Sequence, residues 1–357
     1  MTDLHVVVGA QTGSEGKGHV THRLIRRDIE TARRFKPHQI ANIRVAGPNA
    51  GHTVVTDEGT ALPLRTIPVG VATPGVLLYI AAGSEVDLSV LESELAMCKD
   101  AGYPTLGRIF IHEEATLLEP EHIEAETGMR ERMGSTGKGI GAARAARVMR
   151  TARRVKDVRE QVHNMGVRVI SETSYQVRIG QARAIVIEGT QGYDLGQTAG
   201  YYPQCTSSNT RAIDFLAMAG INPWAAGMDL QVWCVARVYP IRVAGNSGPL
   251  KEETTWEQLG LEAERTTVTK KVRRVGQFDM DQIRRAVEAN GGGTSGRVSV
   301  ALTMVDQLAP GVGGAQTKGD FRSGANQALL DLIEEIRENT NTRVDLATTS
   351  ANTGVWL

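Results

Sequence analysis

Short apolar runs alternate with amphipathic stretches along most of the chain. The runs are rich in β-branched residues and are bounded by glycine, proline or polar residues, which is typical of buried strands. We expect strands at residues 4–8, 40–45, 77–81, 108–111, 184–187, 231–238, 298–303 and 344–347. Apolar residues spaced three and four apart predict helices at 20–27, 88–101, 142–164, 210–219, 280–289 and 324–339.

This alternation predicts an α/β fold, with a mainly parallel central sheet flanked by helices. The glycine stretch at 291–296 is short and precedes a strand, so we expect a surface loop there and a single domain over residues 1–357. Ligands of such folds bind at the carboxyl ends of the strands. Glycine-rich loops that follow or connect the expected elements, at 9–18, 47–51 and 134–141, are therefore the first places to look for chemistry.

Composition narrows the function classes. Lys and Arg number 40 and Asp and Glu also number 40, so the net charge gives no reason to expect binding to nucleic acid or to an anionic membrane. The three cysteines form no metal-binding pair, and no targeting or membrane-spanning segment is apparent. We therefore expect a cytoplasmic protein.

The loop after the first strand reads Gly13-Ser14-Glu15-Gly16-Lys17-Gly18. Glycines allow backbone N–H groups to approach phosphate oxygens, the following helix favours an anion at its N-terminus, and Lys17 adds positive charge. The spacing differs from the Walker A pattern. A tight turn without a ligand is the plainer alternative, but the lysine favours a phosphate site.

Two further loops carry candidate chemistry. His52, between Gly51 and Thr53, is placed to donate to a phosphoryl oxygen, although a lone histidine is more often a packing residue. The loop from Ser135 to Gly141 offers hydroxyl and N–H groups at a helix start. The arginines that follow it form either a phosphate clamp on one helix face or a solvated basic face, and they include Arg144, Arg147, Arg150, Arg153, Arg154 and Arg159.

The second half of the chain contains four weaker signals. Gln191 follows a strand and could read a purine edge, and residues 206–210 are rich in hydroxyl and amide groups. Residues 266–274 interleave threonine with lysine and arginine, which suits a small carboxylate. Asp306 follows a strand, where it either binds a purine or caps the next turn.

Taken in order, these segments resemble the adenylosuccinate synthetase family. The family's Gly-Asp-Glu-Gly-Lys-Gly loop corresponds to residues 13–18, and its Asn-Ala-Gly-His-Thr to residues 49–53. Its Thr-Thr-Gly-x-Gly-Ile-Gly corresponds to residues 135–141. The Glu-Gly-Thr-Gln-Gly, Thr-Ser-Ser-Asn-Thr and Thr/Arg segments follow in the family's order.

The resemblance implies a magnesium-dependent ligation in two steps, in which a nucleoside triphosphate phosphorylates a purine nucleotide and L-aspartate then displaces the phosphate. It makes Ser14, Lys17 and His52 the catalytic positions. The implied triphosphate site is Gly13, Ser14, Glu15, Gly16, Lys17, Gly18, Gly51, His52, Thr53, Asp306, Thr348 and Ser350. The implied nucleotide site is Ser14, Asn49, Ser135, Thr136, Arg150, Gln191 and Thr206. The implied aspartate site is Thr267, Val268, Thr269, Lys270 and Arg274, and the implied Mg²⁺ ligands are Ser14 and Gly51. Arg150 would serve a neighbouring subunit, which implies a homodimer.

Two departures from the family pattern point to a different substrate. Ser14 stands where the family has its catalytic aspartate, and a hydroxyl is a poor base and a weak metal ligand. Its small neutral side chain leaves room for a 2-amino group, which favours dGMP over IMP. Met304 stands where the family's guanine-reading motif has lysine, which favours ATP or dATP over GTP. Both changes resemble the phage-encoded 2-aminoadenylosuccinate synthetase branch, for which the site of action would be the host cytoplasm.

Two alternatives stay open at this point. An ordinary adenylosuccinate synthetase would use IMP and GTP. A nucleotide-binding protein that lost catalysis together with the aspartate would bind without turnover, although the retained Lys17 and His52 argue against it.

Overall fold

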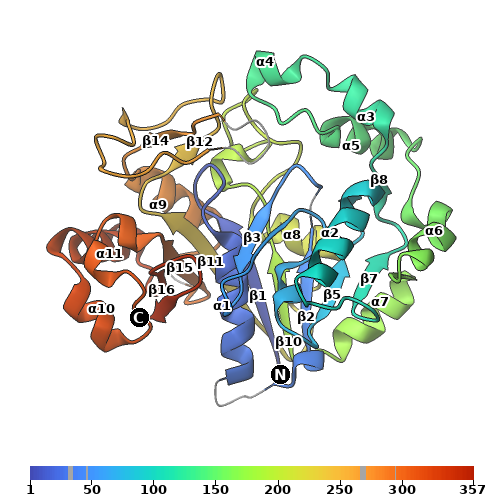
Figure 1. Cartoon of the computed structure of the whole chain (residues 1–357), viewed down its shortest axis with the longest axis horizontal. Helices are drawn as coiled ribbons and strands as arrows, with labels where there is room; N and C mark the ends of the chain where they lie inside the picture. The colour runs from blue at the N-terminus through green and yellow to red at the C-terminus, as the bar shows by residue number, and fades with distance from the viewer. Residues whose placement is uncertain (31–34, 46, 266–270, 294) are drawn as a thin grey trace.

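A ten-stranded sheet runs through the centre of the molecule (Figure 1). The computed structural model describes residues 1–357 except 31–34, 46, 266–270 and 294, and only the backbone of 130 and 131. Neighbouring strands are parallel except for the last pair, β16 with β17. The strand order is β17 (Gly354–Trp356), β16 (Val344–Thr348), β15 (Val298–Thr303), β11 (Met228–Arg237), β1 (Thr2–Gly9), β10 (Ala184–Glu188), β2 (Ile40–Arg44), β5 (Leu77–Ile80), β7 (Ile109–His112) and β9 (Arg168–Ile170).

The α/β fold and each of the expected strands are confirmed. β1 lies between β10 and β11, and Leu4, Val6, Val7 and Val8 are fully buried because both faces of the sheet are covered. The sequence analysis did not find β9 and β17. Each has three residues, too few for a period-2 pattern to stand out.

Helices cover both faces of the sheet and bury alternate residues of each strand. Val7 and Val235 face one core together with α1 and α2, and Val8 and Ala236 face the other together with α8 and α9. The helices are α1 (Lys17–Glu30), α2 (Leu88–Asp100), α3 (Pro120–Ala125), α4 (Met129–Met133), α5 (Ile140–Met149), α6 (Arg159–Asn164), α7 (Glu172–Gly180), α8 (Ala212–Ala219), α9 (Met280–Ala289), α10 (Lys318–Gly324) and α11 (Gln327–Thr340).

The expected helix at 142–164 is wrong as a single element. α5 ends at Met149, where Arg150 adopts a left-handed conformation with φ of 67°. The chain then turns back, so that the N–H groups of Leu117 and Val155 bond to the carbonyls of Arg153 and Ala115. This backbone pairing with a distant segment, β8 (Thr116–Leu117), competes with the local helical pattern and ends it.

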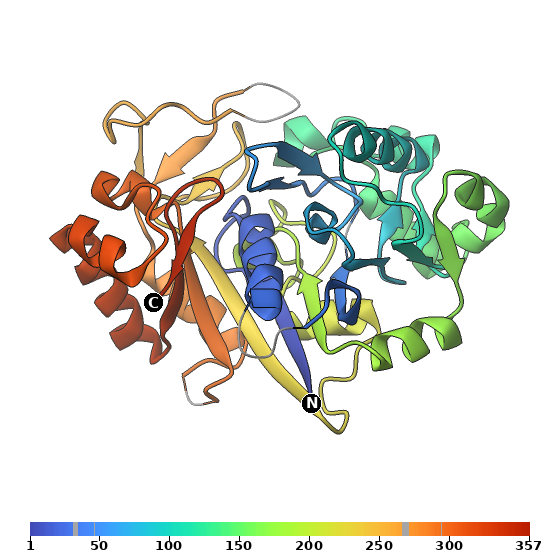
Figure 2. The ribbon, with the colours of Figure 1, turned by 60° about the horizontal axis from the view of Figure 1, so that its bottom comes forward.

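Two smaller units lie beyond the carboxyl edge of the large sheet, on either side of its midline (Figures 1 and 2). One is a three-stranded sheet of β12 (Ile241–Arg242), β14 (Arg274–Gly276) and β13 (Glu253–Thr254), and the other contains α3, α4 and α5. Two-stranded pairs complete the fold: β3 (His52–Val55) with β4 (Ala61–Leu64), and β6 (Glu85–Val86) with β8. Among the described residues, no helix is both long and apolar enough to cross a membrane.

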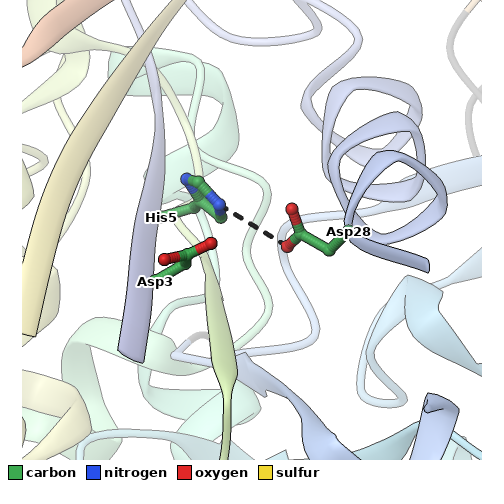
Figure 3. Close-up of side chains that lie close together, drawn as sticks. All are labelled: Asp3, His5 and Asp28. Carbon is green, nitrogen blue, oxygen red and sulfur yellow. Dashed lines mark ion pairs between the residues drawn. The ribbon is translucent and has the colours of Figure 1, made fainter. Parts of the chain in front are cut away.

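At the start of β1, a buried cluster of Asp3, His5 and Asp28 joins the strand to the end of α1 (Figure 3). Nδ1 of His5 accepts from the indole N–H of Trp233 at 3.3 Å, and Nε2 faces the Asp28 carboxylate at 3.5 Å. Both ring nitrogens therefore have partners. We interpret the cluster as an internal hydrogen-bond and ion-pair network that holds α1 on the sheet.

Candidate active site

The glycine-rich loop between β1 and α1 has the backbone geometry of an anion site. Gly13, Ser14 and Gly16 have φ of 90°, 59° and 85°, a region that glycine enters at little cost and serine rarely does. The loop leads directly into the N-terminus of α1, where N–H groups and the helix dipole favour a phosphate. The Ser14 side chain is exposed.

Glu15 points inward beneath this loop. Its fully buried carboxylate accepts from the N–H groups of Gly13 at 2.7 Å and Gln11 at 3.3 Å, and it pairs with the ammonium of Lys17. A side chain at Gly192 would place its Cβ 2.3 Å from Glu15 Oε1. Glu15 thus shapes the loop, and its carboxylate binds the Gly13 N–H group that we expected to bind a triphosphate.

Lys17 is held in place by contacts within the protein. Its ammonium donates to Glu15 and to the backbone carbonyl of Gln191, and its side chain is 3% exposed. Gln191 has φ of 53°, so a strained turn after β10 presents that carbonyl. The structure therefore brings the expected Lys17 and Gln191 together at the carboxyl ends of β1 and β10.

The expected donor-base residues lie along the next strands. Thr303 Oγ1 donates to the Glu15 carbonyl at 2.7 Å, which joins the end of β15 to the loop. Thr348 accepts from the Met304 N–H at 3.0 Å, and Ser350 Oγ is 2.7 Å from Thr353 Oγ1. Asp306 follows Met304 in a short 3₁₀ helix, and burial raises the pKa of its carboxyl.

His52 belongs to a buried network that the sequence analysis did not assemble. Nδ1 of His52 and NH1 of Arg44 each lie 3.0 Å from Oε2 of Glu188, and the other carboxylate oxygen accepts from the Val69 N–H at 2.7 Å. Arg44 and Glu188 are 1% and 0% exposed. Arg44 NH1 also lies 3.0 Å from Nδ1 of His52. Because an ionised carboxylate only accepts hydrogen bonds, we assign the proton of neutral His52 to Nδ1.

Nε2 of His52 is buried, and among the described residues it has no hydrogen-bond partner. Burial and the charge of Arg44 lower the pKa of His52 to about 4, against the opposing effect of Glu188. For Glu188, burial alone would raise the pKa, but the bonds from His52 and Arg44 lower it on balance. The imidazole is thus neutral near pH 7, with a lone pair that can take a proton when an anion approaches.

His52 and the glycine loop are neighbours. A Cβ on Gly18 would lie 3.0 Å from both the His52 Cβ and the carbonyl oxygen of Thr53. Gly51 and Thr53 are exposed on either side of the histidine, and Asn49 is half-buried in the preceding turn. This geometry brings together residues of the expected phosphate and triphosphate sites from β1, α1 and β3.

In the loop at 134–141, where we expected a nucleotide phosphate, backbone N–H groups bind a carboxylate of the protein itself. The buried carboxylate of Glu126 accepts from Gly139 at 2.8 Å and from Gly141 at 2.7 Å, at the start of α5. The N–H groups that we expected to be available for a phosphate are thus partly occupied. Ser135 Oγ accepts from the Gly137 N–H at 3.1 Å.

The same loop lies against another expected segment. A Cβ on Gly141 would be 3.0 Å from Ser207 Oγ, and Arg144 donates to the Ser207 carbonyl at 3.1 Å. Ser135 and Thr136 are therefore on the side of the molecule that carries Thr206, which is half-buried. The grouping of these three residues as a nucleotide site stays a prediction.

The arginine run is not one helix face. Five of its six members pair with carboxylates: Arg144 with Glu85, Arg147 and Arg154 with Glu114, Arg153 with Glu119, and Arg159 with Glu113. Arg150 is exposed, and the described residues contain no ion-pair partner for it. Of the six arginines, Arg150 thus remains the candidate for a phosphate clamp. The other five form ion pairs at the surface of the protein.

The expected aspartate residues Thr267, Val268, Thr269 and Lys270 lie outside the described residues. Arg274 is described, and its guanidinium forms two hydrogen bonds with Glu253 at 2.7 and 2.6 Å. The preceding Arg273 is the one that reaches the glycine loop, where NH1 donates to Ser14 Oγ at 2.9 Å. The sequence analysis included Arg273 in the segment 266–274 but singled out Arg274, because sequence spacing does not say which of two adjacent arginines faces inward.

Ser14 is a poor ligand for Mg²⁺ in this arrangement. Its hydroxyl is neutral and accepts from a guanidinium, a cation that would stand beside the metal. The motif carboxylates Glu15 and Glu188 are paired with Lys17 and with Arg44. The expectation that Ser14 is a magnesium ligand therefore does not fit, and Gly51, whose carbonyl we also expected to bind, remains untested.

One signal in the sequence could have revealed the histidine network. Arg44 and Arg237 are charged residues at the ends of the mainly apolar strands β2 and β11, and both are almost completely buried. A charge in such a strand needs a partner and often marks a functional site. Glu188 gives the same signal at the end of β10.

Comparison with protein-family models gives one match. The model described as adenylosuccinate synthetase matches residues 6–178 and 160–310. The chain belongs to the adenylosuccinate synthetase family. It is accordingly an enzyme of the ligase class that forms C–N bonds, which confirms the resemblance drawn from the motifs.

Curated relatives include phage and archaeal members of the family. The N6-succino-2-amino-2'-deoxyadenylate synthase of Vibrio phage phiVC8 is 34% identical over 297 residues, 80% of this chain and 82% of the relative. The adenylosuccinate synthetase of Thermococcus sibiricus is 32% identical over 351 residues, 97% of this chain and 95% of the relative.

Two solved structures share the fold. One is the cyanophage S-2L succinoaminodeoxyadenylate synthetase, bound to dGMP and to dATP as an energy donor. It is 28% identical to this chain, with a TM-score of 0.81, and the match covers 100% of this chain and 95% of the cyanophage chain. The adenylosuccinate synthetase of Plasmodium falciparum, 18% identical with a TM-score of 0.80, covers 99% of each chain and supports the fold alone.

Proposed function

We propose that this enzyme joins L-aspartate to C6 of dGMP with ATP or dATP as the phosphoryl donor, forming 2-amino-2'-deoxy-N6-succinyl-adenylate. The observation that carries the proposal is Ser14, a small neutral side chain exposed in the glycine loop, where the family pattern has aspartate. A 2-amino group next to that position meets space and a hydroxyl acceptor in place of a carboxylate.

The relatives support this substrate choice. The phiVC8 protein is named for a 2-amino-2'-deoxyadenylate product, and the S-2L structure holds dGMP and dATP. Met304 adds an independent argument about the donor, because it replaces the lysine of the guanine-reading motif. Loss of that charged group removes a reason to prefer GTP.

The reaction we propose has two steps. O6 of the purine attacks the γ-phosphorus of the donor, so that an O6–P bond forms and the bond to the β-phosphate oxygen breaks. The aspartate amine then attacks C6, forming the C–N bond as the C6–O6 bond breaks and phosphate leaves. Positioning and charge neutralisation provide most of the catalysis in such transfers.

In this scheme Lys17 and the N–H groups of the loop bind the transferring phosphoryl group. As the charged phosphates bind, His52 takes a proton from solvent on Nε2 and donates it in a hydrogen bond to a phosphoryl oxygen, while Glu188 stabilises the imidazolium through Nδ1. Ser14 is too weak a base to remove the N1 proton of guanine directly at neutral pH. We propose that a water held by the Ser14 hydroxyl, or the phosphoryl group itself, accepts this proton.

We also propose that two copies form a dimer and that Arg150 serves the neighbouring site. Arg150 lacks an ion-pair partner among the described residues, and the adjacent Val148 and Met149 are 74% and 72% exposed. Apolar side chains exposed beside a free arginine are typical of a protein interface. The donor is proposed to enter as its magnesium complex in the host cytoplasm, where nucleotides are available.

A substrate matrix tests the proposal. Phosphate release and product mass are measured with dGMP or IMP, each combined with ATP, dATP or GTP, in the presence of aspartate. We expect turnover with dGMP and an adenine donor. Turnover of IMP with GTP alone would identify an ordinary adenylosuccinate synthetase, and binding without phosphate release in any combination would identify an inactive nucleotide-binding protein.

The Ser14→Asp variant then tests the role of position 14. It is expected to lower kcat/KM for dGMP at least tenfold more than for IMP, because only dGMP has the 2-amino group. Equal losses for the two nucleotides would overturn the argument from Ser14.

A further inference from the structure

A small cavity lies near the amino ends of β2 and β5, beside the end of α7. Its volume is about 60 Å³. The glycine loop at 13–18 follows the carboxyl end of β1, and β1, β10, β2 and β5 are parallel, so the cavity lies toward the opposite edge of the sheet from the candidate active site. His38 and Gln181 line the cavity and are exposed, which connects it to the surface.

Two polar groups of the cavity lining make no hydrogen bond. The hydroxyl of Tyr79 and Nε of Arg178 are both buried, and neither has a hydrogen-bond partner among the described residues. Both side chains line the cavity. Buried polar groups are nearly always hydrogen-bonded, to protein or to a bound molecule. Two such groups at one cavity therefore indicate that the cavity accommodates a ligand.

The arginine is held beside the cavity by an aromatic cluster. Its guanidinium lies 4.5 Å from the centre of the Phe110 ring, and that ring stacks on Tyr79 with the centres 5.2 Å apart. Tyr175 meets Tyr79 edge-on from α7, with the ring centres 5.9 Å apart. These contacts fix the directions of the Tyr79 and Arg178 side chains before a ligand binds.

The fixed charge of the cavity lining is positive. Arg178 stays protonated at any working pH, and within the described part of the chain no ion pair joins it to a carboxylate. Burial raises the pKa of the Tyr79 hydroxyl to about 12, so this group is neutral and keeps its proton. The nearby guanidinium opposes this rise, but no hydrogen bond joins the two groups. None of the described lining residues is acidic.

We propose that this cavity binds a small monovalent anion, held by the Tyr79 hydroxyl and the Arg178 guanidinium. Both groups donate hydrogen bonds, so the ligand accepts them, and one cation suits one negative charge. A water molecule has a share of about 30 Å³ in the liquid, so this volume admits an ion such as chloride or formate and excludes a nucleotide. The site is separate from the proposed ligase reaction, and its occupant would fasten α7 to the sheet.

Bromide is the direct probe of the site, because its anomalous scattering distinguishes it from water. Crystals grown with sodium gluconate are soaked in sodium bromide, and data are collected at the bromine absorption edge. We expect an anomalous peak within hydrogen-bond distance of the Tyr79 hydroxyl and Arg178 Nε. A water molecule at that place, without an anomalous peak, would overturn the proposal.

Thermal melts measure the binding in solution. Chloride is raised from about 10 to about 300 mM, and sodium gluconate, whose anion is too large for the cavity, keeps the ionic strength constant. We expect the melting temperature of the wild-type protein to rise by about 2–4 °C, because the anion binds only the folded chain. Tyr79→Phe keeps the ring and removes one donor, and Arg178→Gln removes the charge. Each should reduce the rise by more than half.

Arg168→Gln is the matched control. Arg168 also lies over the Phe110 ring, at 5.9 Å, but it is exposed and does not line the cavity. This variant should keep the full response to chloride, as should any chloride effect that arises at the glycine loops.

The comparison of variants decides the outcome. An equal response of the wild type, Tyr79→Phe and Arg178→Gln would overturn the proposal, and so would an equal reduction in all three arginine and tyrosine variants, which would indicate a general effect of surface charge. A bromide peak without any chloride response in solution would mean binding at crystal concentration only and would also overturn it. If Arg178→Gln does not fold, Tyr79→Phe against Arg168→Gln decides.

Discussion

Two glycine-rich loops of this enzyme differ in the carboxylate that binds their backbone N–H groups. The loop at 13–18 and the loop at 134–141 each precede a helix, and each has a buried carboxylate on its backbone N–H groups. In the first loop the carboxylate is Glu15, a member of the loop itself. In the second it is Glu126, which comes from a turn 13 residues before Gly139.

The surroundings of the two loops differ as well. The first follows β1, which has partners on both sides in the large sheet, and Lys17 compensates Glu15. The second rests on a small cluster of three apolar residues, Leu118, Ile140 and Ala143. The comparison teaches that the first loop is preorganised by the main core, whereas the second depends on one remote carboxylate.

The largest expected effect comes from breaking the buried network beside the first loop. Glu188→Gln leaves Arg44 without its charge partner and gives His52 a neutral amide in place of an ionised acceptor. We therefore expect the free energy of unfolding to fall by about 3–5 kcal/mol. The rate of phosphoryl transfer should fall at least a hundredfold. Urea unfolding and single-turnover kinetics measure the two effects.

Glu114→Gln is the matched control for that variant. Glu114 also binds three cations, Arg147, Arg154 and Lys156, but it is 31% exposed. An exposed pair contributes little, so we expect a loss of no more than about 1 kcal/mol and an unchanged rate. Similar losses for the two variants would contradict the distinction between core and surface.

A close approach in the first loop predicts the next effect. Gly192→Ala places a methyl group 2.3 Å from Glu15 Oε1 and 2.4 Å from the Gln11 carbonyl oxygen, so the loop must shift. We expect a loss of about 2–3 kcal/mol in thermal or urea unfolding. Gly180→Ala lies at a helix end where the added Cβ meets no described atom beyond its own helix within 4 Å, and it should be neutral or stabilising. Equal stability of these two alanine variants would show that the loop is not tightly packed.

The pH dependence of stability tests the buried histidine beside the first loop. In the unfolded chain, His52 becomes protonated near pH 6.5, whereas in the folded protein its pKa is lowered to about 4. Lowering the pH therefore favours unfolding. From pH 7 to 5 this contributes a loss of about 2 kcal/mol. Urea titrations of His52→Gln should show a pH dependence shallower by that amount. An identical slope in the variant would mean that His52 is not buried as a neutral group.

The smallest effect is expected in the second loop. Glu126→Gln removes the charge from the hydrogen bonds to Gly139 and Gly141 at the start of α5, which should cost about 1 kcal/mol. Hydrogen exchange should become faster at residues 139–142 and remain unchanged at residues 11–18. Faster exchange in both loops would show that they are coupled, which would contradict the difference between the two loops.

The sequence by itself determined the sheet and the order of the motifs. The strands at the centre are continuous apolar runs, and the pattern of burial on both faces is local information. Ser14, Lys17 and His52 remain predicted site positions, which rest on short motifs at the starts of α1 and β3 and on the family resemblance.

Only the tertiary structure decided the partners of the charged residues. In the folded protein α5 ends at Met149, and five arginines pair with glutamates. Arg273, and not Arg274, contacts Ser14. Arg44 and Glu188 lie beside His52. Hydrophobic periodicity reports what each segment buries, but an ion pair joins residues that are far apart in the chain. Arg44 and Glu188 are 144 positions apart, and only the packing of β2 beside β10 brings them together.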